Sequence, residues 1–210
     1  YRSQILKKRA TIVDYGLGNL HSVANALRFL GIEVILADTA KSVSDASHLI
    51  LPGVGAFADG MAGLQQRGQD AAILDYVKSG RGPLLGICLG AQLLLGESEE
   101  FVRTKGLGVV PGKVSVIPSN GQKVPHVGWK QVHLTEHGRA QSIVENWTWA
   151  YFVHSFHVVP ENPEHILATA PYGESLVTAM SGRDTVFGCQ FHPEKSGLAG
   201  LQILAAFMKL

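Results

Sequence analysis

The sequence is poor in charged residues and contains only two cysteines. Charged residues make up 17% of the 210 residues and hydrophobic residues 46%, which excludes a disordered chain, because such chains combine low hydrophobicity with high charge. The formal net charge of +1 excludes the strongly basic surface by which many proteins bind nucleic acids or membranes. Cys88 and Cys189 are too few for a disulfide framework. We therefore expect a globular protein of the reducing cytoplasm, with no nucleic-acid or membrane partner.

Long hydrophobic runs are also missing. The apolar runs, such as Leu93–Leu95, are far shorter than the roughly 20 residues that a membrane-spanning helix needs. Residues 1–9 lack the apolar core of a signal peptide. We expect residues 1–9 to be an extension and residues 10–210 to form one domain, since the sequence shows no repeat, low-complexity tract or linker.

In the first half of the sequence, short apolar stretches alternate with helical patterns. The predicted strands are Ala10–Tyr15, Glu33–Leu36, His48–Leu51 and Pro83–Cys88, and the predicted helices lie at Asn19–Leu30, within Phe57–Ser79 and at Leu89–Leu95. This alternation predicts an α/β fold with a doubly wound, mostly parallel sheet and helices on both faces. Short β-branched or aromatic segments within 106–134 and 147–190 predict antiparallel additions or an edge sheet, and Gly197–Leu210 predicts a closing helix.

Cys88 lies between a predicted buried strand and a predicted helix, in the segment Gly86-Ile87-Cys88-Leu89-Gly90. This is the nucleophile-elbow pattern with Cys in place of Ser, in which glycines permit a sharp turn and a close approach of the backbone. The following helix N-terminus favours a thiolate, and the N–H of Leu89 could hold an oxyanion. The alternative is a small apolar residue in the core, which the two flanking glycines make less attractive.

His192 and Glu194 are the candidate partners of this cysteine. They lie in Phe191-His192-Pro193-Glu194, after a predicted strand at Thr185–Gln190. His192 could act as general base and acid, with Glu194 holding its tautomer. Alone, a His-Pro-Glu sequence is usually an exposed turn. Cys189 is interpreted as a core thiol, because it lacks the turn.

A second glycine-rich turn, Pro52–Phe57, follows the predicted strand His48–Leu51. It is either an ordinary loop or a second source of oxyanion-binding N–H groups, most plausibly at Val54. No lysine follows its glycines, which argues against a phosphate-binding loop.

These motifs resemble those of the class I glutamine amidotransferases from about Ala10 to the C-terminus. Further segments are similar to those of the glutaminase subunits of imidazole glycerol phosphate synthases in histidine biosynthesis. They are Asp14–Asn19, Pro52–Phe57, Pro125–Trp129 and Phe191–Ser196. The resemblance implies a flavodoxin-like sheet, no cofactor or metal, and hydrolysis of L-glutamine by Cys88, His192 and Glu194 through a thioester.

The resemblance also assigns residues that we would otherwise interpret as ordinary. The oxyanion hole would comprise Leu89, Val54 and Gly55, and glutamine would contact Gly53, Gln92, Glu100, Tyr151, His154, Ser155 and Phe156. Ammonia would pass to a (β/α)8-barrel cyclase subunit that makes imidazole glycerol phosphate and aminoimidazole carboxamide ribotide. Asn19, Trp129 and Lys195 would lie at that heterodimer interface, although Trp129 could be a core aromatic and Lys195 a solvated charge.

Three alternatives stay open at this point. Lys130 and Ala91 stand where the resembled subunits often have Asn and Met, which leaves room for a paralogue in an amino-sugar pathway of surface polysaccharides. A stand-alone glutamyl hydrolase or peptidase could share the fold. A non-catalytic scaffold is disfavoured by the intact Cys88, His192 and Glu194 and by Gln92.

Overall fold

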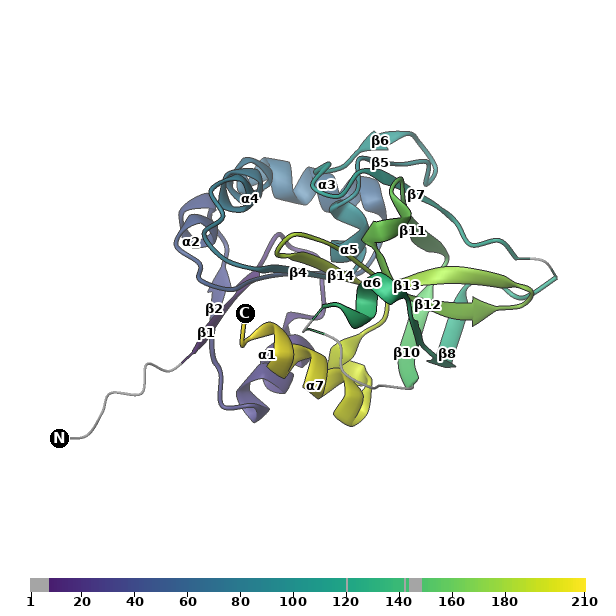
Figure 1. The fold of residues 1–210 in the computed structure, drawn as a ribbon. Coiled ribbons are helices and arrows are strands. Elements are labelled where there is room, and N and C mark those ends of the chain that lie inside the picture. The colour runs from purple at the N-terminus through teal and green to yellow at the C-terminus, as the bar shows by residue number, and fades with distance from the viewer. Residues whose placement is uncertain (1–7, 120, 142, 144–148) are drawn as a thin grey trace.

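The central element is an eight-stranded mixed sheet, seen edge-on in Figure 1. The computed structural model describes residues 8–119, 121–141, 143 and 149–210. Five parallel strands lie in the order β2-β1-β3-β4-β14, which is the order of a flavodoxin-like doubly wound sheet. Their bounds are Arg9–Val13 for β1, Glu33–Ala37 for β2, Leu49–Gly53 for β3, Leu84–Cys88 for β4 and Val186–Cys189 for β14.

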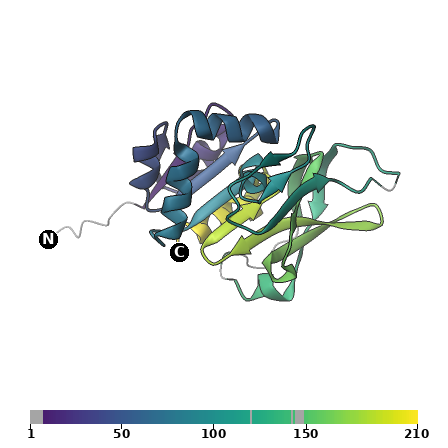
Figure 2. The same cartoon turned by 90° about the horizontal axis from the view of Figure 1, so that it is seen from above.

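Antiparallel strands extend this sheet beyond β14. They are β13 (Ser175–Arg183), β12 (Ile166–Tyr172) and β9 (His133–Leu134). Two small sheets lie at the same end of the molecule, which Figure 2 shows opposite the N-terminal strands. One pairs β8 (His126–Gln131) with β10 (Trp149–His154), and the other contains β5 (Glu97–Ser98), β6 (Thr104–Lys105), β7 (Gly112–Val116) and β11 (Phe156–Pro160).

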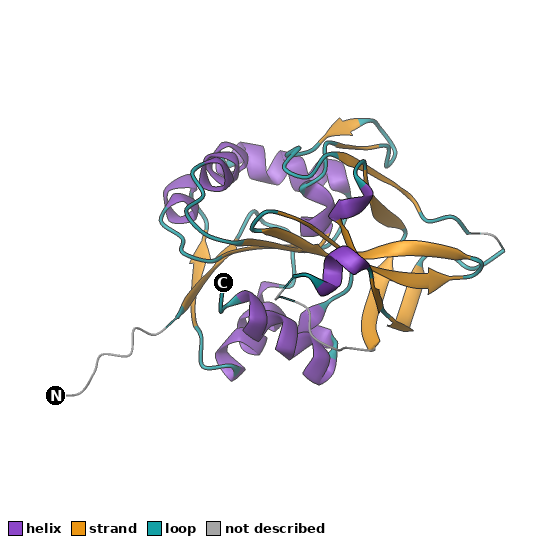
Figure 3. Ribbon diagram, in the orientation of Figure 1, coloured by secondary structure: helices purple, strands orange, loops and turns teal. Residues whose placement is uncertain are grey.

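Helices cover both faces of the parallel strands (Figure 3). One face carries α2 (Ala40–Ser44), α3 (Phe57–Gln66), α4 (Gln69–Lys78) and α5 (Leu89–Leu93), and the other carries α1 (Leu20–Phe29) and α7 (Gly197–Phe207). The strands contribute apolar side chains to two cores: Ile12 belongs to the core that contains Leu27 and Phe207, whereas Val13 belongs to the core that contains Leu64. Short helical turns complete the fold: α6 (Glu136–Arg139), η1 (Pro163–His165) and η2 (Pro193–Lys195).

The predicted α/β class and the predicted elements of the first half are confirmed, and the structure refines three of the predicted elements. The helical stretch Phe57–Ser79 is two helices, because Gly68 adopts the left-handed conformation with φ 63° and starts a new one. The strand predicted at Thr185–Gln190 belongs to the parallel part and not to the antiparallel additions, since β14 pairs in parallel with β4. The helix predicted at Asn19–Leu30 begins at Leu20, with Asn19 Oδ1 accepting from Ser22 N at 3.3 Å as its N-cap.

The first strand, β1, begins at Arg9, one residue before the strand predicted at Ala10–Tyr15, and Arg9 pairs with Glu33. The Lys8 ammonium donates to the Met208 carbonyl at 2.7 Å. The rest of the expected extension, residues 1–7, lies outside the described residues.

The register of β3 and β4 determines which residues meet at the candidate site. β3 and β4 pair in parallel, and Gly53 stands opposite Cys88. The carboxyl ends of parallel strands meet at one edge of a sheet, which is where doubly wound folds bind their ligands. The glycine-rich turn after β3 and the cysteine after β4 are therefore neighbours.

Candidate active site

Cys88 occupies a strained turn between β4 and α5. Its φ is 54° and its ψ is −111°, an uncommon backbone conformation for a residue with a side chain. A Cβ on Gly90 would lie 1.7 Å from the Leu51 carbonyl oxygen, and one on Gly86 would lie 2.7 Å from the Ala91 backbone. Only glycine fits at these two positions, so the Gly-x-Cys-x-Gly pattern forms a nucleophile elbow.

His192 and Glu194 form a buried pair beside this cysteine. The His192 Nδ1 lies 2.8 Å from Glu194 Oε1, and their side chains are only 2% and 1% exposed. Pro193 occupies the first turn of η2, which holds both side chains on one side of a single turn. With Nδ1–H donating to the carboxylate, Nε2 is left for the reaction centre.

The pKa of His192 is raised to about 9. Desolvation by burial lowers this pKa, but interaction with the Cys88 side chain and with the Glu194 carboxylate raises it by more. The imidazole is therefore protonated at neutral pH, which suits an imidazolium paired with a thiolate.

The Cys88 sulfur has two further neighbours. It lies 3.9 Å from the Val153 carbonyl oxygen on β10, and the Gln190 side-chain amide donates to it from 3.9 Å. Gln190 is fully buried just after β14. Sequence reasoning missed Gln190, although an amide at the end of a strand that is otherwise apolar was a signal for it.

A pocket of about 280 Å³ opens above the cysteine. It brings together most of the predicted site residues, namely Val54, Gly55, Cys88, Leu89, Gln92, Glu100, His154, Ser155, Phe156 and His192. Gly53, Tyr151 and Glu194 do not line it. Gly53 lies beneath the elbow, and the Tyr151 ring packs edge-on against Trp129 with 6.0 Å between centroids. Tyr151 contributes its backbone, since its carbonyl accepts from His192 N at 3.0 Å.

Two polar residues of the pocket are anchored by the fold. Glu100 Oε2 accepts from the N–H of Phe57, the first residue of α3, at 2.8 Å. Gln92 Nε2 donates to the Phe156 carbonyl at 3.0 Å. An anion and an amide in fixed positions can bind an ammonium and a polar group of a small ligand.

A buried histidine pair supports the rim of the pocket. His154 Nδ1 donates to the Phe156 carbonyl at 2.8 Å, and His126 Nδ1 donates to His154 Nε2 at 3.0 Å. Burial lowers the pKa of His154 to about 3 and that of His126 to about 4. Both rings are therefore neutral at pH 7, so they shape the pocket without adding charge to it.

Comparisons with known proteins agree with this geometry. The family model "Glutamine amidotransferase class-I" matches residues 11–210. The chain belongs to the class I glutamine amidotransferase family. It is 47% identical over 199 residues to imidazole glycerol phosphate synthase subunit HisH of Moorella thermoacetica, covering 95% of this chain and 93% of that one. It is 42% identical over 196 residues to the HisH of Chlorobaculum tepidum, covering 93% and 97%.

Solved structures show the same amidotransferase fold. The structure of PurLQS from Thermotoga maritima has a TM-score of 0.72 at 18% identity and covers 97% of this chain and 99% of that one. A crystal structure described as glutamine amidotransferase has a TM-score of 0.70 at 20% identity, with 94% and 96% covered. The α/β class predicted from the sequence is thus the fold of this family.

The three predicted interface residues of this amidotransferase lie at different depths. Trp129 on β8 is 50% exposed, which contradicts the alternative of a core aromatic. Lys195 is exposed at the end of η2. Asn19 is half-buried at the start of α1, and together with His192 and Glu194 it lines a small void behind the elbow.

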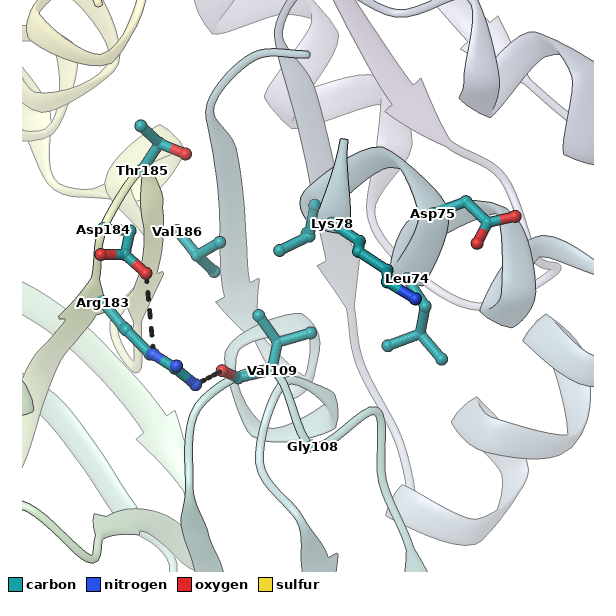
Figure 4. Close-up of a pocket in the computed structure, with 10 residues that line it drawn as sticks. Leu74, Asp75, Lys78, Gly108, Val109, Arg183, Asp184, Thr185 and Val186 are labelled. Atoms are coloured by element: carbon teal, nitrogen blue, oxygen red, sulfur yellow. Dashed lines mark hydrogen bonds and ion pairs between the residues drawn. The ribbon is translucent and has the colours of Figure 1, made fainter. Parts of the chain in front are cut away.

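A second, larger cavity of the amidotransferase, of about 600 Å³, lies at the opposite edge of the sheet, where β4 and β14 begin. Figure 4 shows Arg183 and Lys78 on opposite sides of it, with Arg183 bonded to the Val109 carbonyl and next to Asp184. None of the residues that line it carries a thiol or an imidazole, whereas the Cys88 pocket has both.

Within residues 8–119, 121–141, 143 and 149–210, no group of three or more His, Cys, Asp or Glu side chains could hold a metal ion. In the same part of the chain no helix combines the length and apolarity needed to cross a bilayer.

Proposed function

We propose that the chain is the glutaminase subunit of an imidazole glycerol phosphate synthase in histidine biosynthesis. It hydrolyses L-glutamine to glutamate and ammonia and supplies the ammonia to a cyclase subunit. The observation that carries the proposal is the buried His192–Glu194 pair, 2.8 Å apart, whose His192 lines one small pocket together with Cys88. The HisH relatives, 42–47% identical over almost the whole chain, support the pathway.

The first step is attack of the Cys88 thiolate on the side-chain amide carbon of glutamine. The carbonyl π pair moves to oxygen, and the resulting oxyanion accepts from the Leu89 N–H and from the turn at Val54 and Gly55. Leu89, Val54 and Gly55 line the same pocket as Cys88, because β3 and β4 end at the same level, which supports this role for their N–H groups.

His192 moves the protons of the reaction. Its Nε2–H protonates the amide nitrogen, the C–N bond breaks, and ammonia leaves behind a glutamyl thioester. Nε2 then accepts a proton from water, which attacks the thioester carbon and releases glutamate and the thiolate. Glu194 stabilises the imidazolium at 2.8 Å throughout.

The rest of the pocket selects glutamine by charge and polarity. The Glu100 carboxylate, anchored at Phe57, binds the α-ammonium. Gln92 Oε1 accepts from the same α-ammonium, because Gln92 Nε2 already donates to the Phe156 carbonyl and to Gln190 Oε1. The Ser155 hydroxyl donates to the α-carboxylate. Neutral His154 holds the wall that presents these groups.

The partner docks on the exposed face of β8 and β10. Val127, Trp129 and Val153 are 55%, 50% and 36% exposed and share this face with Tyr151, because cross-strand pairing places Trp129 opposite Tyr151 and Val127 opposite Val153. Asn19 and Lys195 extend the surface beside η2. We expect a (β/α)8-barrel cyclase there, in a heterodimer assembled in the cytoplasm.

The test reconstitutes the chain with the cyclase and compares glutamine with ammonium as nitrogen donor. Cys88→Ala should abolish glutamine-driven synthesis and leave ammonium-driven synthesis intact, since only the nucleophile is lost. Glutamine hydrolysis retained by Cys88→Ala would overturn the mechanism. Assembly only with an amino-sugar synthase, or high activity of the isolated chain on γ-glutamyl peptides, would overturn the pathway.

A further inference from the structure

We propose that Gln190 is a further catalytic residue, which stabilises the Cys88 thiolate through a hydrogen bond from its side-chain amide. The inference rests on the proposed function in that Cys88 is the nucleophile. It concerns a residue that the triad mechanism does not use. The supporting observations are the position of Gln190, the orientation of its amide and the chemistry around the sulfur.

The position of Gln190 in the sheet brings its side-chain amide close to the Cys88 sulfur. It follows β14, whose pairing with β4 places Cys189 opposite Ile87, so Gln190 comes level with Cys88. Its side chain is fully buried, and its Nε2 lies 3.9 Å from the Cys88 Sγ. Ordering a long side chain costs conformational entropy, and burying an amide costs solvation free energy unless a hydrogen-bond partner compensates. For the Gln190 Nε2, the Cys88 thiolate is that partner.

A chain of hydrogen bonds determines which atom of the Gln190 amide faces the sulfur. The backbone carbonyl of Phe156 can only accept, so the Gln92 atom 3.0 Å from it is the donor Nε2. The same Gln92 Nε2 donates to the Gln190 atom at 3.2 Å, which must therefore be Oε1. The remaining atom of Gln190, Nε2, is then directed to Cys88.

The Gln190 amide is a permanent hydrogen-bond donor to the sulfur, which the titratable neighbours of the thiol are not. The titratable groups around Cys88 are His192 with Glu194 behind it, Tyr15, His154 and Glu100. Tyr15 donates its hydroxyl to the Pro52 carbonyl at 2.8 Å, His154 is neutral and Glu100 is acidic. His192 gives its proton to the leaving ammonia, whereas the Gln190 N–H stays a donor at every stage and favours the thiolate whenever sulfur carries charge.

The experiment measures the pH midpoint of Cys88 alkylation by iodoacetamide in the isolated full chain, with the modified peptide identified by mass. Cys189 does not interfere, because it is fully buried and burial raises its pKa. We expect Gln190→Met, which has similar volume and no donor, to raise the midpoint by about one pH unit. Gln190→Glu retains the acceptor for Gln92 and replaces the donor by an anion, and it should raise the midpoint further.

The matched control is Gln69→Met. Gln69 is also fully buried, but its Nε2 donates to the carbonyls of Asp14 and Ala37, so its loss should lower thermal stability and leave the midpoint unchanged. With the cyclase present, Gln190→Met should lower the glutamine-driven kcat roughly tenfold at pH 7. The kcat of this variant should recover at pH values above its new alkylation midpoint. A midpoint of Gln190→Met equal to that of wild type would overturn the inference.

If the variants do not fold, an NMR titration of the wild-type protein still tests the proposed hydrogen bond. The side-chain NH2 signals of Gln190 in ¹⁵N NMR should titrate with the same midpoint as Cys88 alkylation, and this titration should disappear in Cys88→Ser. Signals that do not respond to pH would contradict the inference. Because alkylation needs neither partner nor glutamine, a shifted midpoint without any glutaminase activity would overturn the proposed function alone.

Discussion

Two buried histidines of the pocket, His192 and His154, have opposite pKa shifts. The pKa of His192 is raised to about 9 because Cys88 and Glu194 outweigh desolvation, whereas burial lowers that of His154 to about 3. A raised pKa stabilises the folded state below pH about 6.5, and this stabilisation is lost as the pH rises through 9. A lowered pKa does the reverse, because protonation below pH about 6.5 favours the unfolded chain. Together, the two histidines therefore stabilise the folded state most near pH 6.5.

On the acid side, we expect His154→Asn to reduce the loss of stability below neutral pH. Asn retains a donor for the Phe156 carbonyl and removes the group that resists protonation. At pH 5, wild-type His154 costs on the order of 2 kcal/mol of the free energy of unfolding relative to pH 7. Urea unfolding at pH 5 and 7 measures this difference. His21→Asn, on an exposed histidine, is the control and should behave like wild type; an unchanged pH dependence in His154→Asn would disprove the assignment.

At the scale of secondary structure, the β4–α5 elbow depends on close packing of backbone against backbone. α5 crosses β3 at Gly90, directly over the Leu51 carbonyl, and Gly86 lies under Ala91. The elbow is positioned by neighbouring strands, since β4 is held between β3 and β14 over its length. Its strained φ at Cys88 is maintained by these contacts.

We expect Gly90→Ala to destabilise the protein by about 3 kcal/mol or more, because the new methyl group would overlap the Leu51 carbonyl and force α5 away from β3. Gly31→Ala is the matched comparison. Gly31 has φ +76° and open space around its Cβ position, so only backbone strain of about 1 kcal/mol applies. Chemical denaturation of both variants measures the two costs, and equal costs would show that α5 can move aside.

At the scale of the whole molecule, the proposed partner surface and the proposed reaction centre share a strand, β10. β10 presents Tyr151 and Val153 on the exposed face with β8, and its backbone accepts from His192 N at 3.0 Å and lies 3.9 Å from Cys88 Sγ. The Ser196 hydroxyl donates to the His192 carbonyl at 2.7 Å and accepts from Tyr151 N at 3.0 Å. A displacement of β10 would therefore be transmitted to both Cys88 and His192.

We expect Trp129→Ala to weaken binding of the cyclase by at least about 30-fold, the effect of removing an aromatic anchor worth about 2 kcal/mol or more. The thermal stability of the isolated chain should change little, since Trp129 is 50% exposed. Titration calorimetry with purified cyclase measures the affinity. Phe29→Ala, an exposed aromatic at the far end of α1, is the control and should bind normally; equal affinities of the two variants would place the interface elsewhere.

The sequence by itself determined the local features. Apolar alternation located the first four strands, and glycine spacing identified the elbow at Cys88. The pairing of His192 with Glu194 is also local, because the two side chains lie on one short turn. These are properties of residues close in the chain, so pattern and local geometry suffice. The resemblance to a known family added Gln92 and Glu100, which no local pattern distinguishes.

Only the tertiary structure decided which distant segments meet. Parallel pairing of β14 with β4 brings His192 and Gln190 to Cys88, although short β segments in that half of the sequence predict antiparallel strands. Register also turned Tyr151 away from the pocket and toward Trp129, and it joined Gln92, Gln190 and the Phe156 carbonyl into one chain of hydrogen bonds. Contacts between residues nearly a hundred positions apart depend on strand order and register, and these follow from packing of the whole sheet rather than from any stretch of sequence.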